Sequence, residues 1–434
     1  MNVCVIGGGY VGTVTAAGLA RRGTNVVLLE VDPERVRSFA RGEVPFHEPG
    51  LQDLFAAMVR DGHLRVDGDP GRALEDADAI LICVGTPLDA AGGADLTQVR
   101  SACSEVRRWA PDAVVVIRST LPLGSTDLVT EWLGRADMDG VATNPEFLRQ
   151  GTAIDDFLRP NRIVIGTSTG RRTAAAEVVE RLYAGIDAPV IVGDFASAEL
   201  IKNAANAYLA MKLSFVNEIA DLCEAYGGDI DTVTKGIGLD PRIGSSYLRP
   251  GIGFGGSCLP KELDNLVRLG RSQDLAIHTF AAASQSNVER PGRIATRLER
   301  VLGPLAGQRI GLLGLAFKAG TDDTRYSPAL ALARELLARG ATIRAHDPKV
   351  SAAATDGLDG LVRTAKMEDV FADADLVVLA TEWPDYRAAD WRALAERVRT
   401  PVVFDGRNLL DRSDLEAAGW RVISVGTRAG EAPR

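Results

Sequence analysis

The sequence predicts an α/β protein built from two doubly wound, Rossmann-like domains joined by a long central helix. Three observations lead to this fold class. A strand, a glycine-rich turn and an alanine-rich helix open the chain, a similar order of strands and helices returns after residue 303, and residues 197–226 between them have a helical period. Short apolar strands that alternate with helices are typical of parallel sheets covered by helices on both faces.

Composition narrows the classes of partner. The 434 residues carry a net charge of −9 and no basic stripe, which argues against nucleic acid and anionic membranes. No apolar run approaches the ~18 residues of a membrane span, and the first residues predict a strand rather than a signal peptide. Five scattered cysteines without a CxxC pair, beside four histidines, indicate reduced thiols and no structural zinc site. We therefore expect a cytoplasmic protein with no metal, membrane or nucleic-acid partner.

A dinucleotide-binding fingerprint follows the first strand. Asn2–Ile6 leads directly into Gly7–Gly12, GGGYVG, and then into a helix. Gly7 is expected to make the tight turn and Gly9 to let a pyrophosphate approach the helix N-terminus. Gly12 is expected to let the helix pack closely on the strand.

An acidic residue ends the second strand. Glu30 closes the strand that begins at Asn25 and lies 18 residues beyond Gly12, close to the ~20 typical of this fingerprint. A carboxylate here would bind the adenosine ribose and repel a 2′-phosphate, so NAD is predicted over NADP. Arg35 lies near enough to leave NADP open as the alternative. The other alternative is a glycine-rich turn that binds nothing, but the strand, helix and acid complete the context.

Three polar residues follow the next apolar strands. Thr86, Thr120 and Glu146 each come after a strand end, and ligands collect at the carboxyl ends of parallel strands. We expect the two threonines beside the cofactor; the alternative is that each hydroxyl only caps the following helix. The strands are Ala79–Val84, Val114–Ile117 and Val141–Asn144.

The central helix is predicted from Ser197, its expected N-cap, to about Tyr226. At 1.5 Å per residue it would be roughly 45 Å long, which predicts a spine between two lobes or a dimer interface. Lys202 and Asn206 are spaced i and i+4 and share a face; we expect a site there, and a solvated pair is the alternative. The apolar stripe comprises Leu200, Ile201, Ala204, Tyr208, Met211, Phe215, Ile219, Leu222 and Cys223.

One cysteine stands apart from the other four. The stretch Arg249–Glu262, RPGIGFGGSCLPKE, concentrates glycine and proline around Cys258. Such backbone neither propagates a helix nor fills a core, so we expect a loop that wraps a ligand, with short helices from about Leu263. Lys261 would lower the pKa of the thiol. A thiolate beside a nicotinamide predicts oxidation of an aldehyde through a thiohemiacetal and then a thioester that water cleaves.

The last third of the chain repeats features of the first. LARRGTNVVLLEVDP is echoed by LLARGATIRAHDP, and EDADAILICVGTP by FADADLVVLATEW. Two elements that recur in the same order predict a second doubly wound domain. Because it lacks GxGxxG, we do not expect it to bind a second dinucleotide in the same way. Lys318 and Arg325 would bring positive charge for phosphates, and Arg407 follows the last strand of this domain.

These motifs together resemble the UDP-glucose/GDP-mannose 6-dehydrogenase family over nearly the whole chain. They occur in the family's order: GGGYVG, VGTP, RSTLP, NPEFLRQGTAI, ELIKNAANAYLAMKLSFVNE, RIG, GFGGSCLPK, GLAFKAGTDDTR and FDGR. The resemblance implies an NAD-binding Rossmann domain at residues 1–196, a central helical and dimerisation domain with the cysteine loop at 197–302, and a nucleotide-sugar-binding Rossmann-like domain at 303–434. It implies NAD-dependent four-electron oxidation of C6 of a nucleotide-hexose, UDP-glucose to UDP-glucuronate, with GDP-mannose or a dTDP-hexose as alternative substrates.

The resemblance also implies a role for each matching residue. The catalytic set is Cys258, Lys202, Asn206, Glu146, Thr120 and Glu262. The cofactor-binding set is Gly7, Gly9, Tyr10, Val11, Gly12, Glu30, Arg35, Thr86, Thr120, Gln150 and Arg325. The substrate-binding set is Glu146, Phe147, Leu148, Lys202, Asn206, Arg242, Tyr247, Arg249, Gly255, Lys318 and Arg407.

Within these sets, Cys258 is implied to be the nucleophile and Lys202 to stabilise the oxyanion. Asn206 would hold the C6 oxygen or a water, and Glu146 would be the base in thioester hydrolysis, with Thr120 ordering the water. Arg242 is implied to reach the sugar from the partner subunit of a homodimer.

Three departures from the family pattern bear on substrate choice. Glu262 replaces the usual aspartate, Gln150 replaces a glutamate, and Arg325-Tyr326-Ser327 replaces the usual RES. They suggest a shifted substrate rather than lost activity, because Cys258 and Lys202 are present. Two other classes are weighed against this: an inactive binding regulator, which loss of those two residues would have indicated, and a simple alcohol dehydrogenase, which would yield one NADH per sugar instead of two.

Overall fold

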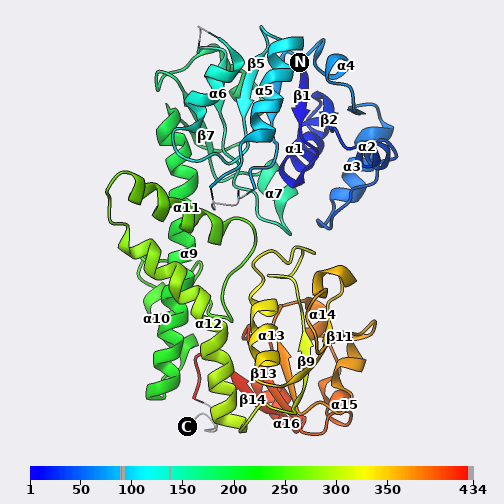
Figure 1. The fold of residues 1–434 in the computed structure, drawn as a ribbon, viewed down its shortest axis with the longest axis vertical. Helices are drawn as coiled ribbons and strands as arrows, with labels where there is room; N and C mark the ends of the chain where they lie inside the picture. The colour runs from blue at the N-terminus through cyan, green and yellow to red at the C-terminus, as the bar shows by residue number, and fades with distance from the viewer. Residues whose placement is uncertain (88, 90–92, 136–137, 429–434) are drawn as a thin grey trace. The chain divides into compact units, whose positions relative to one another are not determined.

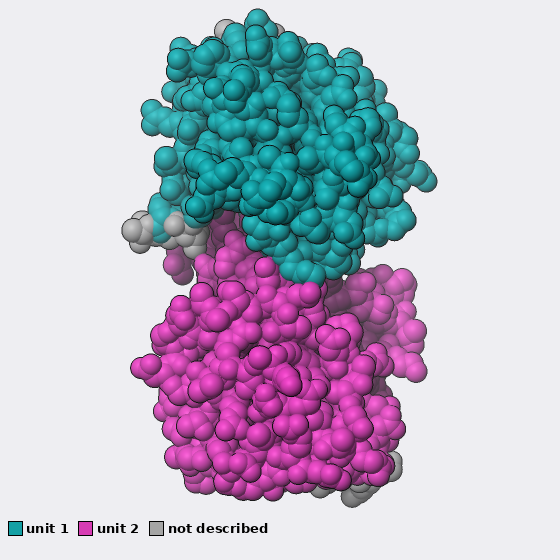
Figure 2. Space-filling model, turned by 90° about the vertical axis from the view of Figure 1, so that its right-hand side faces the viewer, with its two compact units in different colours: residues 1–204 teal, residues 205–434 magenta. Residues whose placement is uncertain are grey.

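The computed structural model describes residues 1–87, 89, 93–135 and 138–428 (Figure 1). The end of the third predicted domain, 429–434, lies outside the described residues. The chain divides into two compact units, Met1–Ala204 and Ala205–Arg434, which Figure 2 shows in different colours. No helix in the described part of the chain is long and apolar enough to cross a membrane.

The first unit contains an eight-stranded sheet in the order β3-β2-β1-β4-β5-β6-β7-β8. Its pairs are parallel except β6–β7, which is antiparallel and has the single pairing Thr143–Gly166. The strands are β1 Asn2–Ile6, β2 Asn25–Leu29, β3 Leu64–Asp67, β4 Ala79–Ile82, β5 Val114–Ile117, β6 Val141–Thr143, β7 Ile163–Thr167 and β8 Val190–Asp194.

Helices cover both faces of this sheet. In β1, Val3 and Val5 pack into one hydrophobic cluster, and Cys4 and Ile6 pack into another. The four buried residues of β1 are therefore all apolar, as burial of a parallel strand on both faces requires. The helices are α1 Tyr10–Arg21, α2 Pro33–Ala40, α3 Leu51–Arg60, α4 Pro70–Leu74, α5 Thr97–Trp109, α6 Ser125–Leu133, α7 Ala153–Leu158 and α8 Ala174–Leu182.

The second unit contains a six-stranded parallel sheet in the order β11-β10-β9-β12-β13-β14. This is the order of the first six strands of the other sheet, so the predicted fold class, two doubly wound domains with a long central helix, is confirmed. The strands are β9 Arg309–Leu313, β10 Thr342–His346, β11 Leu361–Arg363, β12 Leu376–Leu379, β13 Val402–Asp405 and β14 Arg421–Ser424.

The helices of this part include the longest in the chain as described, α9, whose residues lie in both units. They are α9 Phe195–Tyr226, α10 Ile230–Gly238, α11 Leu259–Ser272, α12 His278–Leu302, α13 Pro328–Ala338, α14 Pro384–Arg387, α15 Trp391–Ala395 and α16 Arg412–Ala417, with 3-10 turns η1 Ala352–Thr355 and η2 Met367–Phe371.

Three local predictions were wrong. Ser197 is not the N-cap of α9, because β8 runs directly into the helix and the side chain of Asp194 accepts the Ser197 N–H at 2.7 Å. The cysteine loop does not extend to Glu262, because α11 begins at Leu259 with Pro260 in its first turn, where a missing N–H has no cost. The segment after it does not consist of short helices, since α12 continues for 25 residues through the buried Pro291.

The turn after β1 yields a test of backbone packing. Gly12→Ala is expected to lower the free energy of unfolding by roughly 3 kcal/mol, because its Cβ would lie 1.8 Å from the carbonyl oxygen of Gly7. Gly9→Ala is the matched control, since no heavy atom lies within 4 Å of its Cβ position and its φ of −69° suits alanine. Urea denaturation measures both; equal stability of the two variants would contradict this packing.

Candidate active site

The glycine-rich turn leaves open backbone at the start of α1. Gly7 has a φ of +105°, and a Cβ there would lie 3.0 Å from the Cys83 carbonyl. Gly9 is the N-cap of α1 and borders open space, while Gly12 touches the backbone of Gly7. The free N–H groups of a helix N-terminus bind anions, so this turn fits the pyrophosphate of a dinucleotide.

Glu30 is buried at the end of β2 and is held by the same turn. Its carboxylate accepts hydrogen bonds from the N–H groups of Gly8 at 3.1 Å, Val31 at 2.8 Å and Asp32 at 3.0 Å. Arg35 lies 3.6 Å from this carboxylate and donates to the Gly8 carbonyl. The Arg35 charge is therefore engaged by the acid, which weakens the case for a 2′-phosphate ligand.

The two threonines lie together at the strand ends. The Thr86 hydroxyl donates to the Thr120 carbonyl at 2.9 Å. The N-cap of α5 is Leu96 and that of α6 is Gly124, so the alternative that each threonine caps the next helix is wrong.

The sequence analysis did not single out Glu48, whose carboxylate forms hydrogen bonds with residues far from it in the sequence. Glu48 is buried and accepts the Tyr10 hydroxyl at 2.5 Å and the N–H groups of Gly151 at 2.6 Å and Ala153 at 2.8 Å. Burial and the Glu48 carboxylate raise the pKa of Tyr10. Gln150 precedes Gly151 in the same turn, while Val11 follows Tyr10 and packs against the core. An acid in the turn before α3 was the available signal, but its partners are far away in sequence.

A buried ion pair joins the end of β6 to α9. Lys202 Nζ lies 2.9 Å from Glu146 Oε1, and each side chain is 6% exposed. The other carboxylate oxygen of Glu146 accepts the Leu148 N–H at 2.6 Å. The Phe147 ring has Lys202 at 5.3 Å and the Arg162 guanidinium at 3.7 Å from its centroid. The pair thus combines a cation that can stabilise an oxyanion with a carboxylate that can accept a proton.

Asn206 follows Lys202 by one turn of α9. Its Nδ2 is buried and has no hydrogen-bond partner among the described residues. A buried donor without a partner is unusual in a folded protein, and a bound ligand would satisfy it.

Cys258 is exposed and occupies the N-cap position of α11. Its Sγ lies 3.7 Å from the Ser257 hydroxyl. Burial lowers the pKa of Lys261, and the charges of Glu262 and Cys258 oppose that shift. The partial positive charge of the helix N-terminus and a nearby cation both favour a thiolate at this position.

The remaining cysteines are unsuited to nucleophilic chemistry. All four are buried, and burial raises the pKa of Cys4, Cys83 and Cys103 to about 12. Burial also raises the pKa of Cys223.

The cysteine loop packs tightly against the turn between β9 and α13. A Cβ at Gly255 would lie 2.2 Å from the Tyr326 carbonyl oxygen, so the backbones touch there. Gly256 has a φ of +80° and donates its N–H to the Arg325 carbonyl at 2.9 Å. The guanidinium of Arg325 forms a bidentate ion pair with the Asp323 carboxylate.

Two of the predicted substrate-binding cations, Arg407 and Lys318, lie close to backbone carbonyls or to an aromatic ring. Arg407 donates to the carbonyls of Ala380 at 2.7 Å, Phe317 at 2.9 Å and Gly253 at 3.3 Å. Lys318 Nζ lies 5.8 Å from the centre of the Phe317 ring. Arg407 therefore connects the cysteine loop to the strand ends of the second sheet.

Three further predicted substrate residues lie before the loop. Arg249 donates to the Asn408 carbonyl at 2.7 Å, and Tyr247 has a left-handed φ of 60°. Arg242 is 87% exposed and pairs with Asp240 at 2.6 Å.

A dinucleotide fingerprint, a second doubly wound domain and an exposed thiol at a helix N-terminus define a nucleotide-linked dehydrogenase. The NAD-binding domain of the UDP-glucose/GDP-mannose dehydrogenase family matches residues 1–187, its central domain matches residues 196–289 and its UDP-binding domain matches residues 311–412. The chain belongs to this family. It is an NAD-dependent nucleotide-sugar dehydrogenase, and the resemblance seen in the sequence is confirmed.

Individual relatives match along the whole chain. UDP-glucose 6-dehydrogenase YwqF of Bacillus subtilis (strain 168) is 38% identical over 99% of this chain and 98% of its own. The structure of a UDP-glucose dehydrogenase from Pyrobaculum islandicum has a TM-score of 0.88 at 36% identity, covering 99% of this chain and 98% of its own. A UDP-D-ManNAc dehydrogenase from Pyrococcus horikoshii has a TM-score of 0.85 at 27% identity, covering 98% and 99%.

The buried ion pair yields a test by double-mutant cycle. Lys202→Met is expected to lower the free energy of unfolding by about 3–5 kcal/mol, because the buried Glu146 carboxylate loses its cation. Adding Glu146→Leu should recover most of this loss, since two apolar side chains need no partner. Urea denaturation of all four proteins measures the coupling, and a coupling energy near zero would refute the pair. Arg159→Met, which breaks an exposed pair with Asp155, is the control and should have little effect.

Proposed function

We propose that this protein oxidises C6 of UDP-glucose to the carboxylate of UDP-glucuronate through a thioester on Cys258. The observation that carries the proposal is the thiol itself, exposed at the N-terminus of α11 while the other four cysteines are buried. Support comes from relatives named UDP-glucose 6-dehydrogenase that match 99% of this chain at 37–38% identity.

The chemistry requires two oxidations at one carbon. Bound NAD supplies the hydride acceptor, one molecule for each oxidation. The first oxidation converts the C6 alcohol to an aldehyde, to which the Cys258 thiolate adds as a thiohemiacetal. The second converts this adduct to a thioester, and water then cleaves the carbon–sulfur bond to release the carboxylate and the thiol.

The other catalytic roles follow from the chemistry of the side chains. Lys202 donates to the oxygen on C6 when that oxygen carries negative charge, and the unpartnered Nδ2 of Asn206 adds a second donor. Glu146 accepts a proton from the hydrolytic water, which Thr120 helps to order. Glu262, buried in the first turn of α11, steers the groups around the thiol.

Cofactor contacts are proposed for the glycine-rich turn, for residues near the strand ends that follow it and for Arg325. The backbone of Gly7, Gly9, Tyr10, Val11 and Gly12 receives the pyrophosphate, and Glu30 receives the adenosine ribose. Arg35 fixes Glu30. Thr86, Thr120, Gln150 and Arg325 complete the proposed cofactor set.

Substrate contacts are proposed for two groups of residues. Phe147 and Leu148 are proposed to contact the sugar. Tyr247, Arg249, Gly255 and Lys318 are proposed to contact the nucleotide-sugar. Arg407 acts through the carbonyls of Phe317 and Gly253 that it holds.

Homodimerisation is proposed through the exposed face of α9. Tyr208, Phe215 and Leu222 are spaced by seven residues and are 52%, 48% and 53% exposed. A row of large apolar side chains on one helix face marks an interface. Arg242, which is highly exposed, would reach the partner's sugar site. We also propose the three-domain division given above and a cytoplasmic location.

Cys258→Ser is expected to abolish uronate formation, because the hydroxyl is a far weaker nucleophile than a thiolate. Wild type should yield about two NADH per UDP-glucose, as a four-electron oxidation requires. NADH absorbance together with product chromatography measures both, and Cys223→Ala, at a buried cysteine, is the control. Full turnover by Cys258→Ser would refute the thioester. One NADH per sugar would indicate a simple alcohol dehydrogenase.

The same assay with GDP-mannose and a dTDP-hexose tests the alternative substrates. Glu262, Gln150 and Tyr326 differ from the usual family residues, which is a reason to compare these two substrates with UDP-glucose. A higher kcat/KM with either of them than with UDP-glucose would move the proposal to that nucleotide-sugar.

Phe215→Asp is expected to convert a dimer into a monomer, because it places a charge in the middle of the apolar row. Light scattering after size-exclusion chromatography measures the mass. Val288→Asp, at a residue of α12 that is 75% exposed, is the control and should remain dimeric. A Phe215→Asp protein that keeps the mass of wild type would contradict this interface.

A further inference from the structure

The loop that precedes Cys258 has a buried backbone without regular secondary structure. Residues 250–256 are all buried and form neither helix nor strand. Buried N–H and C=O groups must find partners, and no ladder or helical turn supplies them here. Side chains from α9 and α12 therefore take over this task.

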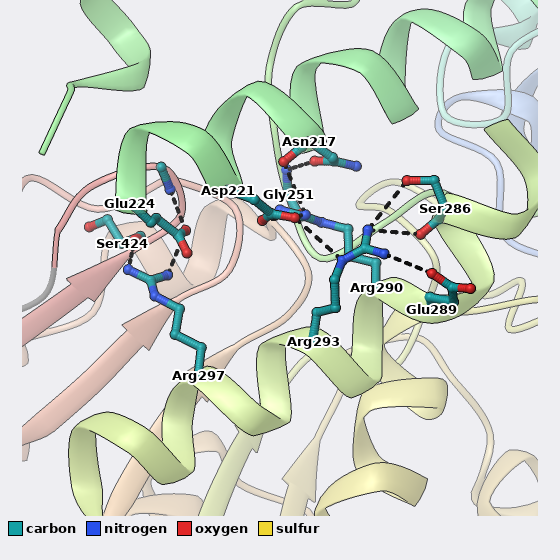
Figure 3. A network of polar contacts seen from close by, with 11 residues as sticks. Asn217, Asp221, Glu224, Gly251, Ser286, Glu289, Arg290, Arg293, Arg297 and Ser424 are labelled. Atoms are coloured by element: carbon teal, nitrogen blue, oxygen red, sulfur yellow. Dashed lines mark hydrogen bonds and ion pairs between the residues drawn. The ribbon is translucent and has the colours of Figure 1, made fainter. Parts of the chain in front are cut away.

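Gly251 is held on both sides by side chains of two helices. Its N–H donates to Asn217 Oδ1 at 2.9 Å, and its carbonyl accepts Arg290 Nε at 2.5 Å. Figure 3 shows Asn217 and Arg290 meeting at Gly251, with Asp221 beside them. Arg290 is 1% exposed and also pairs with Asp221 at 3.0 Å, so its charge and its position are fixed.

Phe254 is held by one side chain through two bonds. Its N–H donates to Asn287 Oδ1 at 2.9 Å, and its carbonyl accepts Asn287 Nδ2 at 2.9 Å. This reciprocal exchange is the pattern of two paired residues in an antiparallel sheet, with an amide side chain in place of the second strand. The Asn287 amide donates and accepts at once, whereas a carboxylate cannot donate and an alkyl group can do neither.

The loop has further contacts up to the cysteine. Arg407 donates to the Gly253 carbonyl at 3.3 Å, and Gly256 donates to the Arg325 carbonyl at 2.9 Å. Cys258 follows two residues later, at the start of α11. The position of the thiol is therefore set by a loop whose own conformation depends on these side chains.

We propose that Asn217, Asn287 and Arg290 are positioning residues for Cys258. They fix the glycine-rich loop in one conformation and so hold the sulfur at the first turn of α11, where the helix N-terminus favours a thiolate. Charged groups that act on the thiol include Lys261 on α11 and Arg325 on the packed turn, and Glu262 acts on Lys261. The catalytic consequence rests on the proposed function, but the effect on the thiol does not.

The test measures the reactivity of Cys258 directly. Iodoacetamide labelling of the full-length protein is followed against pH, and mass spectrometry identifies the labelled cysteine. Asn287→Ala removes both bonds to Phe254, and Asn287→Asp removes only the donor. Both are expected to slow labelling of Cys258 at neutral pH by about tenfold and to raise the pH midpoint by about one unit, because the thiol leaves its favoured position. Arg290→Lys should act in the same direction.

A matched control separates positioning from general stability. Gln285→Glu makes the same amide-to-carboxylate change on α12 at an exposed residue that contacts Glu289, and should leave the labelling profile unchanged. Melting temperatures are recorded for every variant. Asn287 variants with a lower melting temperature but the wild-type pH midpoint and labelling rate would overturn the proposal. Asn287 would then stabilise the fold without positioning the thiol.

Turnover with UDP-glucose distinguishes this proposal from the proposed function. A shifted labelling profile with a matching fall in kcat at unchanged KM supports both. A shifted labelling profile with unchanged turnover supports the positioning of Cys258 by these residues and contradicts the role of Cys258 as nucleophile.

Discussion

The buried pair of Lys202 and Glu146 sets the rotation of α9 about its own axis. Glu199, one turn earlier, adds to this by accepting the N–H groups of Gly124 at 2.7 Å and Thr126 at 3.0 Å. Because burial of a charge is costly unless it is paired, neither side chain can turn away from the first sheet. The direction of every other side chain of α9 is fixed by this orientation of the helix. Asn206 lies on nearly the same side as Lys202, while Phe215 lies on the opposite side, where it is exposed.

Much of this arrangement could be predicted from local sequence. The strand, turn, helix and acid around Gly7–Gly12 specify a dinucleotide-binding turn within 30 residues, and the repeated strand patterns specify the second sheet. The glycine- and proline-rich composition of the loop was enough to distinguish Cys258 from the other four cysteines, which are buried. These features share one property: the residues that define each of them are close together in the chain.

What could not be predicted are contacts between distant residues. Glu48 binds the N–H of Gly151, 103 positions away, and Asn287 binds Phe254, 33 positions away. A single glutamate or asparagine on an irregular segment has no periodicity that would indicate its partner. The N-terminus of α9 was missed for a different reason: the predicted cap Ser197 and the actual cap Asp194 are both good capping residues, and only the direct passage from β8 into the helix decides between them.

The two doubly wound domains show how one topology serves two purposes. Asp347 directly follows β10 as Glu30 directly follows β2, and it accepts the N–H groups of Leu315 at 2.8 Å and Ala316 at 3.0 Å in the turn after β9. It also accepts the indole N–H of Trp383 at 3.2 Å. Asp347 thus holds the turn after β9 as Glu30 holds the turn after β1, and a Cβ at Gly314 would lie 2.3 Å from Thr381. The second domain keeps the strand order of the first but lacks the GxGxxG sequence in this turn.

The single pairing between β6 and β7 has a consequence for how this protein is assembled from parts. Strands β1 to β6 correspond one for one to the strands of the second sheet, whereas β7, α8 and β8 have no counterpart there. In the sheet, this segment is joined to β6 by the single Thr143–Gly166 pairing, while residues such as Ile165 and Val179 pack into the same hydrophobic cluster as Val3 and Val5. The strand–helix–strand unit is therefore held to the first unit mainly by its apolar side chains, and its last strand continues without a loop into α9.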